Sequence, residues 1–228
     1  MPWIEALDLG PLWLSLRLAL VTTAVLLLIS PPLAWWLATG TSRLRPVVEA
    51  LTALPLVLPP TVLGFYLLIL MSPTAPLGAA WVALTGQTLT FSFTGLVIAS
   101  ILYSLPFAVQ PLQTAFRAIG AAPMEAAASL GAGPVDAFLT VAAPLASRGF
   151  LTAAVLSFAH TLGEFGVVLM VGGNIPERTR VISIAIYEHV ETLTYDQAHL
   201  LSAGLLLLSF LLLLPVYVVN RGRPLHAV

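Results

Sequence analysis

The sequence predicts an all-helical polytopic membrane protein with about five transmembrane helices. Its 228 residues are 59% hydrophobic and only 8% charged, whereas an ordinary soluble domain carries roughly a quarter charged residues. So few charged side chains cannot cover the surface of a water-soluble domain of this size. The apolar stretches lack the period-two alternation of transmembrane strands, so helices are expected rather than a barrel.

A transmembrane helix needs about 20 predominantly apolar residues, and five stretches reach that length. They are residues 12–38, 47–71, 94–117, 149–172 and 198–219. Together they predict one transmembrane domain over residues 1–228, largely surrounded by lipid. The apolar runs within residues 73–93 and 173–197 are too short to span, and we expect them to be interfacial or re-entrant.

The arginines predict the orientation of these helices. If the five segments alternate, one side carries many more arginines than the other. The richer side holds Arg43, Arg45, Arg117, Arg148, Arg221 and Arg223, and the other holds Arg178 and Arg180. The positive-inside rule makes the richer side cytoplasmic, with the N-terminus outside and the C-terminus inside. Residues 1–10 carry no basic residue of a cleavable signal peptide, so the first helix is expected to be retained.

Several classes of function are excluded by composition. The chain has no Cys, which removes disulfides, thiolate catalysis and Cys-based metal sites. It has no Lys for a phosphate-binding Walker A loop, so it is not expected to be an enzyme that hydrolyses ATP or to hold a cofactor itself. A net charge of −1 without a long basic run argues against nucleic acid. The histidines lack ligand spacing, so no metal site is expected.

The loop at residues 120–148 is rich in Ala and far less apolar than its neighbours. It contains Glu125-Ala126-Ala127, then three residues, Gly131, nine residues and Val141-Ala142-Ala143-Pro144. Alanine favours a short helix, and Gly131 followed by Gly133-Pro134 is expected to end it. The sequence therefore predicts a small cytoplasmic helix that meets another protein.

This spacing resembles the EAA loop of binding-protein-dependent ABC importer permeases, although Val and Ala replace the Ile and Leu of its last part. The resemblance implies a helix-in-groove contact with a cytoplasmic ATP-binding subunit. The residues implied to couple the chain to that ATPase are Glu125, Ala126, Ala127, Gly131 and Pro144. It also implies a homodimer in the bacterial inner membrane, an ATPase dimer that binds ATP and Mg²⁺, and an external solute-binding protein.

Residues 54–64, 162–166 and 173–180 resemble oxyanion permeases, and their pattern is most similar to the molybdate permeases of bacterial importers. Sulfate/thiosulfate and tungstate permeases are near relatives. The resemblance implies molybdate as the solute, which composition and spacing do not. Asn174, Arg178 and Arg180, just after the fourth stretch, are candidates for docking the external binding protein.

Intramembrane prolines and hydroxyls give candidate pathway residues. Pro59 and Pro60 interrupt helical hydrogen bonding, which is tolerated where neighbours or a water-filled cavity satisfy the freed carbonyls. They either break the helix beside a solute path or merely kink it for packing. Four candidate pathway residues in the predicted spans carry hydroxyls: Thr61, Ser104, Ser157 and Thr161. These hydroxyls either contact a passing oxyanion or donate to the backbone of their own helix.

Glu164 is an acid deep in a predicted span, with His160 four residues earlier on the same helical face. An intramembrane ionisable residue indicates a functional site. A carboxylate in the path would repel a dianion, so we expect Glu164 to act as a hydrogen-bonded interface or gate residue. In an alternative class, an ion-coupled secondary transporter, His160 and Glu164 would form a proton relay. A purely structural membrane scaffold is a third alternative.

Overall fold

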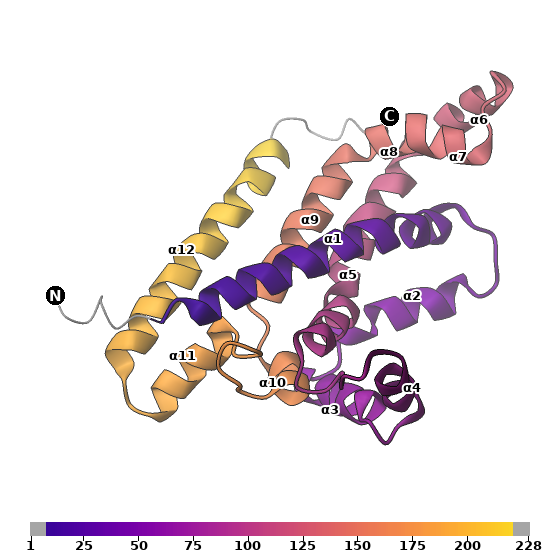
Figure 1. Ribbon diagram of the computed structural model, residues 1–228. Coiled ribbons are helices and arrows are strands. Elements are labelled where there is room, and N and C mark those ends of the chain that lie inside the picture. Colours follow the sequence, from indigo (N-terminus) through magenta and orange to yellow (C-terminus); the bar gives the residue numbers. More distant parts are fainter. Residues whose placement is uncertain (1–7, 221–228) are drawn as a thin grey trace.

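The computed structural model describes residues 8–220, and every regular element within that range is a helix. This confirms the all-helical class. The predictions made for residues 1–7 and for Arg221 and Arg223 lie outside the described residues. Helices from the two halves of the chain interleave, with the first helix lying across later ones (Figure 1).

Three long helices coincide with the first, third and last predicted stretches. They are α1 (Gly10–Thr39), α5 (Phe93–Ile119) and α12 (Tyr195–Asn220). Each is long and apolar enough to cross a membrane. At 1.5 Å per residue, 30 residues span about 45 Å, so α1 exceeds the hydrocarbon thickness of about 30 Å and must tilt. It crosses α5 obliquely in Figure 1.

The second predicted stretch is broken rather than straight. It consists of α2 (Arg45–Ala53), a 3-10 turn η1 (Leu54–Leu56) and α3 (Pro60–Met71), and its halves are bent by 109°. Proline has no N–H to continue the helical ladder, and Pro59 instead occupies the N-cap of α3 with extended backbone. Of the two alternatives for these prolines, the broken helix is the one found.

The fourth predicted stretch, 149–172, is also not one helix, which corrects the prediction. Helix α9 (Ser147–Leu162) ends at Gly163, and α10 (Gly166–Gly172) begins after Phe165. The backbone carbonyl of Glu164, freed by this break, accepts a hydrogen bond from the Ser183 hydroxyl. A side chain from a later segment therefore stabilises an interruption that the sequence pattern did not show.

The loop after α5 contains four short helical elements, where the sequence predicted one small helix within residues 120–148. They are α6 (Ala122–Ser129), α7 (Pro134–Ala137), the π-helical η2 (Phe138–Ala142) and α8 (Ala143–Leu145). The segment Pro134–Leu145 is bent by 73° relative to α9. Counting each bent pair as one span gives up to five spans, and three helices qualify individually.

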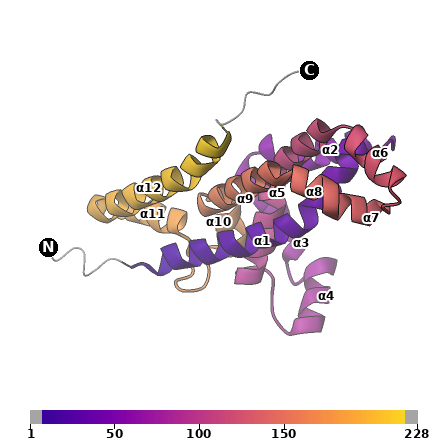
Figure 2. The ribbon, with the colours of Figure 1, turned by 90° about the horizontal axis from the view of Figure 1, so that it is seen from above.

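The two ends of the bundle differ. In Figure 1, α6, α7 and α8 lie at one end of α5, and α4 (Pro76–Thr85), α10 and α11 (Ile182–Glu191) lie toward the other. The short predicted pieces at 73–93 and 173–197 thus each contain one short helix. Figure 2 shows α12 and α11 grouped along one edge of the bundle, while α4 projects away from it.

The core lies mainly where α1, α5 and α9 pack together. Near the end that carries α6, Leu37, Leu112 and Ala153 are fully buried in one cluster. At the other end, Leu18 and Leu96 pack with residues of α10 and α11. Arg17 stays exposed and places its guanidinium 4.6 Å from the centre of the Phe93 ring, a cation–π contact.

Candidate functional site

Helix α6 carries the motif residues Glu125, Ala126 and Ala127. Pro123 lies in its first turn, where a missing N–H costs nothing, and the Glu125 carboxylate there complements the helix dipole. Ala127 is buried, whereas Glu125 and Ala126 are exposed. One face of α6 is therefore exposed, and the face that carries Ala127 packs against the rest of the protein.

Gly131 ends α6 in the left-handed conformation, with φ at +88°. Its N–H bonds the Ala128 carbonyl at 3.0 Å, and the Ala132 N–H bonds the Ala127 carbonyl at 3.0 Å. These two bonds form a Schellman C-cap. A Cβ at Gly131 would meet no atom within 4 Å, so backbone conformation rather than crowding within this chain favours glycine here.

The surface beyond α6 is apolar and open. Leu130 is 90% exposed, Val135 72% and Leu139 60%. We call these three residues the loop-tip surface. Three large apolar side chains exposed on a short helical loop are typical of a protein-binding surface. Pro144, the last motif residue, is exposed in α8 beside the bend into α9.

An aromatic cluster links this loop to the long helices. Phe138 of η2 packs against Trp35 of α1 at 5.6 Å and against Phe116 of α5 at 5.7 Å between ring centroids. Phe116 also meets Phe150 of α9 at 6.1 Å. These contacts join the loop directly to α1 and α5 and, through Phe116, to α9.

A buried polar cluster joins α5 to the break after α9. The Ser100 hydroxyl donates to Glu164 Oε2 at 2.6 Å, and the Ser104 hydroxyl donates to Glu164 Oε1 at 3.0 Å. Ser104 Oγ also lies 2.8 Å from His160 Nδ1 and 2.9 Å from Thr161 Oγ1. Since a hydroxyl has one proton, Ser104 accepts from both of these groups while it donates to the carboxylate.

This geometry brings together three of the predicted residues, Ser104, Thr161 and Glu164. The Glu164 side chain is 1% exposed, and both of its oxygens have hydrogen-bond donors. The Glu164 carboxylate therefore acts as a hydrogen-bond acceptor that joins α5 to the segment between α9 and α10. Ser100 and Ser183 belong to the same group but were not predicted: Ser100 lies one turn before Ser104 and was detectable by that spacing, whereas Ser183 had no signal.

The two broken spans cross at glycine. A Cβ at Gly64 of α3 would lie 2.8 Å from Met170 Cβ, and one at Gly166 of α10 would lie 2.8 Å from Pro60 Cβ. Such distances are too short for any side chain, so the half-helices approach each other at glycine contacts. The Cβ position of Gly163 is less crowded, with its nearest atom at 3.7 Å.

A cavity of about 560 Å³ lies beside this crossing, lined by Pro60, Thr61, His160, Glu164 and neighbours. Pro59, the N-cap of α3, precedes Pro60 and is not among the lining residues. Ser157 is buried, and its Oγ has no hydrogen-bond partner among the described residues; it does not line this cavity. Of the predicted pathway residues, Pro60, Thr61 and Glu164 line this cavity. Ser104 and Thr161 do not line it but belong to the polar cluster around Glu164.

His160 is enclosed between two aromatic rings of α5. Its ring centroid lies 4.7 Å from that of Tyr103 and 3.9 Å from that of Phe107, with which it stacks. Tyr103 and His160 line the cavity of about 560 Å³. Phe107 lines a second, larger groove of about 870 Å³ nearer the α6 end. The stack of Tyr103, His160 and Phe107 therefore separates two hollows along α5 and α9.

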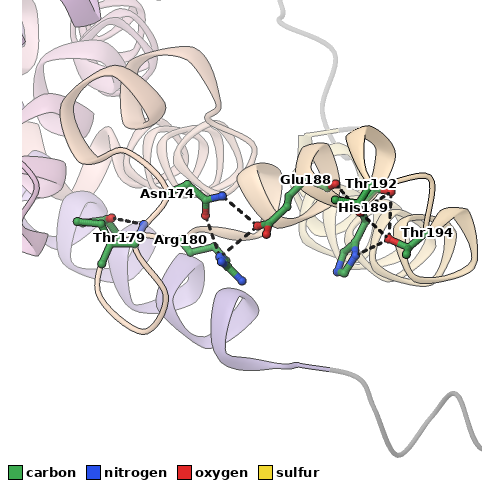
Figure 3. Close-up of polar contacts among 8 residues, drawn as sticks. Asn174, Thr179, Arg180, Glu188, His189, Thr192 and Thr194 are labelled. Atoms are coloured by element: carbon green, nitrogen blue, oxygen red, sulfur yellow. Dashed lines mark hydrogen bonds and ion pairs between the residues drawn. The ribbon is translucent and has the colours of Figure 1, made fainter.

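At the opposite end, the segment between α10 and α11 is held by a polar network (Figure 3). Arg180 Nε donates to Asn174 Oδ1 at 2.8 Å, and Asn174 Nδ2 donates to Glu188 Oε2 at 3.0 Å. Arg180 also lies 3.4 Å from Glu188. Arg178 is exposed and outside this network. The sequence predicted Asn174 and Arg180 together but not Glu188, their acidic partner.

Comparison with known proteins agrees with these features. Residues 30–222 match the family described as "Binding-protein-dependent transport system inner membrane component". The chain is 57% identical over 216 residues to the "Molybdenum transport system permease protein ModB" of Azotobacter vinelandii, covering 95% of this chain and 96% of that protein. It is 33% identical over 184 residues to the "Sulfate transport system permease protein CysT" of Escherichia coli (strain K12), covering 81% and 66%.

A solved structure titled as an inward-facing conformation of the MetNI methionine ABC transporter has a TM-score of 0.73 to this chain. It shares 17% identity and covers 96% of this chain and 97% of the other, which shows a common fold. The matched residues 30–222 include every element from the end of α1 through α12. This chain belongs to the family of binding-protein-dependent transport system inner membrane components.

Proposed function

We propose that this chain is the permease subunit of an ATP-driven importer of molybdate, forming the translocation pathway as a homodimer. The observation that supports molybdate as the solute is the 57% identity, over 95% of the chain, to a molybdenum transport permease. Sulfate is the second candidate, because the chain is also 33% identical to a sulfate permease. Tungstate resembles molybdate in size and charge and is expected to share the path.

Family membership replaces the ion-coupled secondary transporter and the structural scaffold as explanations. A proton relay through His160 and Glu164 is not needed when ATP supplies the energy. The permease itself then has no catalytic site, and hydrolysis belongs to a separate cytoplasmic ATPase dimer that binds ATP and Mg²⁺. An external solute-binding protein delivers the anion.

The coupling contact is proposed for α6 and its surroundings. Glu125, Ala126, Ala127 and Gly131 form or end the helix that enters a groove of the ATPase, and the loop-tip surface extends the contact. Support comes from the exposure of Glu125, Ala126 and the loop-tip surface and from the aromatic packing of Phe138 on Trp35 and Phe116. Closure of the ATPase dimer then moves α1, α5 and α9 as a group, and each bound ligand favours one conformation.

The proposed pathway runs between the two copies along the hollows beside α5 and α9. Thr61, with Pro59 and Pro60, forms part of the outer hollow. Glu164 holds the break between α9 and α10 and does not touch the anion, since its oxygens are buried and already hydrogen-bonded. The stack of Tyr103, His160 and Phe107 is the proposed barrier between the outer and inner hollows.

The proposed docking site for the external binding protein is the segment of Asn174, Arg178 and Arg180. Its network with Glu188 fixes the backbone of this segment, and the exposed Arg178 is available to an acidic partner. Complementary charges on opposing surfaces guide such encounters. This role requires that the segment lie outside the cell.

The proposed orientation places Thr41 and Ser129 in the cytoplasm and Asn174 outside. The chain contains no Cys, so single cysteines at these positions report on one site each. We expect an impermeant thiol reagent added to intact cells to label Asn174→Cys and to leave Thr41→Cys and Ser129→Cys unlabelled until the membrane is opened. Labelling of Ser129→Cys but not Asn174→Cys would reverse the orientation.

The proposed solute is tested by ATP hydrolysis in the assembled complex of permease, ATPase and binding protein. We expect molybdate-loaded binding protein to stimulate hydrolysis above the rate measured with the empty binding protein. Stimulation by a binding protein loaded with a sugar or an amino acid, and none by one loaded with an oxyanion, would refute the assignment. Comparing molybdate, tungstate and sulfate in this assay separates the candidate anions.

A further inference from the structure

The larger groove, of about 870 Å³, lies between α5 and α9 on the α6 side of the aromatic stack. From α5 it is lined by Phe107, Gln110 and Thr114, which follow one face of the helix, and from α9 by Arg148 and Thr152. Leu56 of η1 closes part of it. None of its lining residues is acidic.

Arg148 is the basic residue that lines this groove, and it differs from Arg117 and Arg45, whose guanidinium groups are bound by other groups of the chain. Arg117 is paired with Glu49 at 3.2 Å, and the Arg45 guanidinium donates to the carbonyls of Leu37 and Gly40. Arg148 has no ion pair within residues 8–218. Its positive charge is thus available to an anion that enters the groove.

The other polar groups of the groove also suit an anion. Gln110 and Thr114 are exposed and carry hydrogen-bond donors. The Thr152 hydroxyl donates to the Arg148 carbonyl at 2.9 Å, which ties Thr152 to the backbone that carries the arginine. A guanidinium offers five N–H donors in a fork that matches the oxygens of an oxyanion. The remaining wall includes Pro111 and other apolar residues, which screen a charge less than water does.

We propose that this groove is an inner resting site for a tetrahedral oxyanion, held by Arg148 with Gln110 and Thr114. The site rests on the proposed function, because it lies on the cytoplasmic side of the barrier only in the orientation given above. The anion passes the stack of Tyr103, His160 and Phe107, pairs with Arg148, and leaves toward the cytoplasm.

The test uses a reporter cysteine in the nucleotide-free complex of permease and ATPase, in inside-out vesicles. Ala118→Cys, at an exposed lining position with no proposed role in holding the anion, is probed with an anionic and a cationic thiosulfonate of similar size. We expect Arg148 to favour the anionic reagent, and Arg148→Gln to lower the ratio of anionic to cationic rates by about tenfold. Arg43→Gln, an exposed arginine outside the groove, is the matched control and should leave the ratio unchanged. Thr152→Cys, also in the lining, serves as a second reporter if Ala118→Cys does not assemble.

Protection of the reporter cysteine by molybdate is the second test of the site. Molybdate added to these vesicles should slow modification of the reporter cysteine with Arg148 present and not with Arg148→Gln. Equal rate ratios in the two backgrounds, together with no protection, would overturn the site. If the wild-type complex transports molybdate but this result is found, the site fails and the proposed function stands. If charge selectivity and protection are found without uptake of any oxyanion, the groove binds anions and the proposed function fails.

Discussion

Replacing Gly131 by Leu is expected to abolish molybdate uptake while the permease stays folded and inserted. At φ +88° a side chain costs roughly 1–2 kcal/mol, which favours loss of the Schellman bonds that end α6. We expect the rest of the fold to be retained, because a Cβ at Gly131 meets no atom within 4 Å and the position is exposed. The ATPase then no longer binds a correctly shaped α6, so ATP hydrolysis no longer drives molybdate uptake.

Two variants isolate the backbone effect at Gly131. Gly133→Leu adds the same bulk two residues later, at φ −71° and again with no atom within 4 Å, and should retain coupling. Gly131→Asn should restore part of it, because Asn tolerates the left-handed conformation. Co-purification with the ATPase and uptake are measured for each variant. Normal co-purification and normal uptake in Gly131→Leu would remove this loop as the coupling element.

Replacing Glu164 by Leu is expected to eliminate uptake and to lower the amount of folded permease. The substitution leaves the Ser100 hydroxyl buried without its acceptor, and such an unsatisfied group costs about 1–3 kcal/mol. Ser104 loses its bond to the carboxylate and keeps only His160 and Thr161 as partners. The hydrogen bonds that join α5 to the segment between α9 and α10 are lost. Glu164→Gln should keep measurable uptake, because the amide retains the shape and one acceptor oxygen.

Thr22→Val is a matched control for the loss of buried polarity. Thr22 is fully buried, and its Oγ1 has no hydrogen-bond partner among the described residues, so the isosteric change should leave folding and uptake near wild type. Expression level, thermal unfolding of the purified complex and uptake are compared across the three variants. Complete loss of uptake in a well-folded Glu164→Gln permease would show that the charge is essential.

The sequence predicted those parts of the fold that depend on local pattern. The hydropathy of α1, α5 and α12 is continuous, so their positions followed from length and composition. Gly131 was predicted to end α6 because helix ends have local signals, and its positive φ agrees. The prolines before α3 marked an interruption, but whether they bend or break a helix depends on packing, here on the contact of Gly166 with Pro60.

The break at Glu164 was missed because it depends on distant residues. Residues 149–172 are apolar enough for one helix, and Gly163 and Gly166 beside Glu164 do not by themselves require an interruption of a membrane helix. Ser183 satisfies the freed Glu164 carbonyl, and Ser100 and Ser104 hold its carboxyl. For the same reason, the pairing of Arg180 with Glu188 was not predictable from spacing alone.

Uptake by proteoliposomes tests the central claim most directly. The permease is reconstituted with its ATPase, the vesicles are loaded with ATP, and the binding protein is supplied outside with labelled molybdate, tungstate or sulfate. We expect molybdate to accumulate only when ATP, ATPase and binding protein are all present, and Gly131→Leu to abolish this accumulation. Accumulation of molybdate driven by an ion gradient without ATP, or ATP-driven accumulation of a non-oxyanion solute alone, would contradict the assignment.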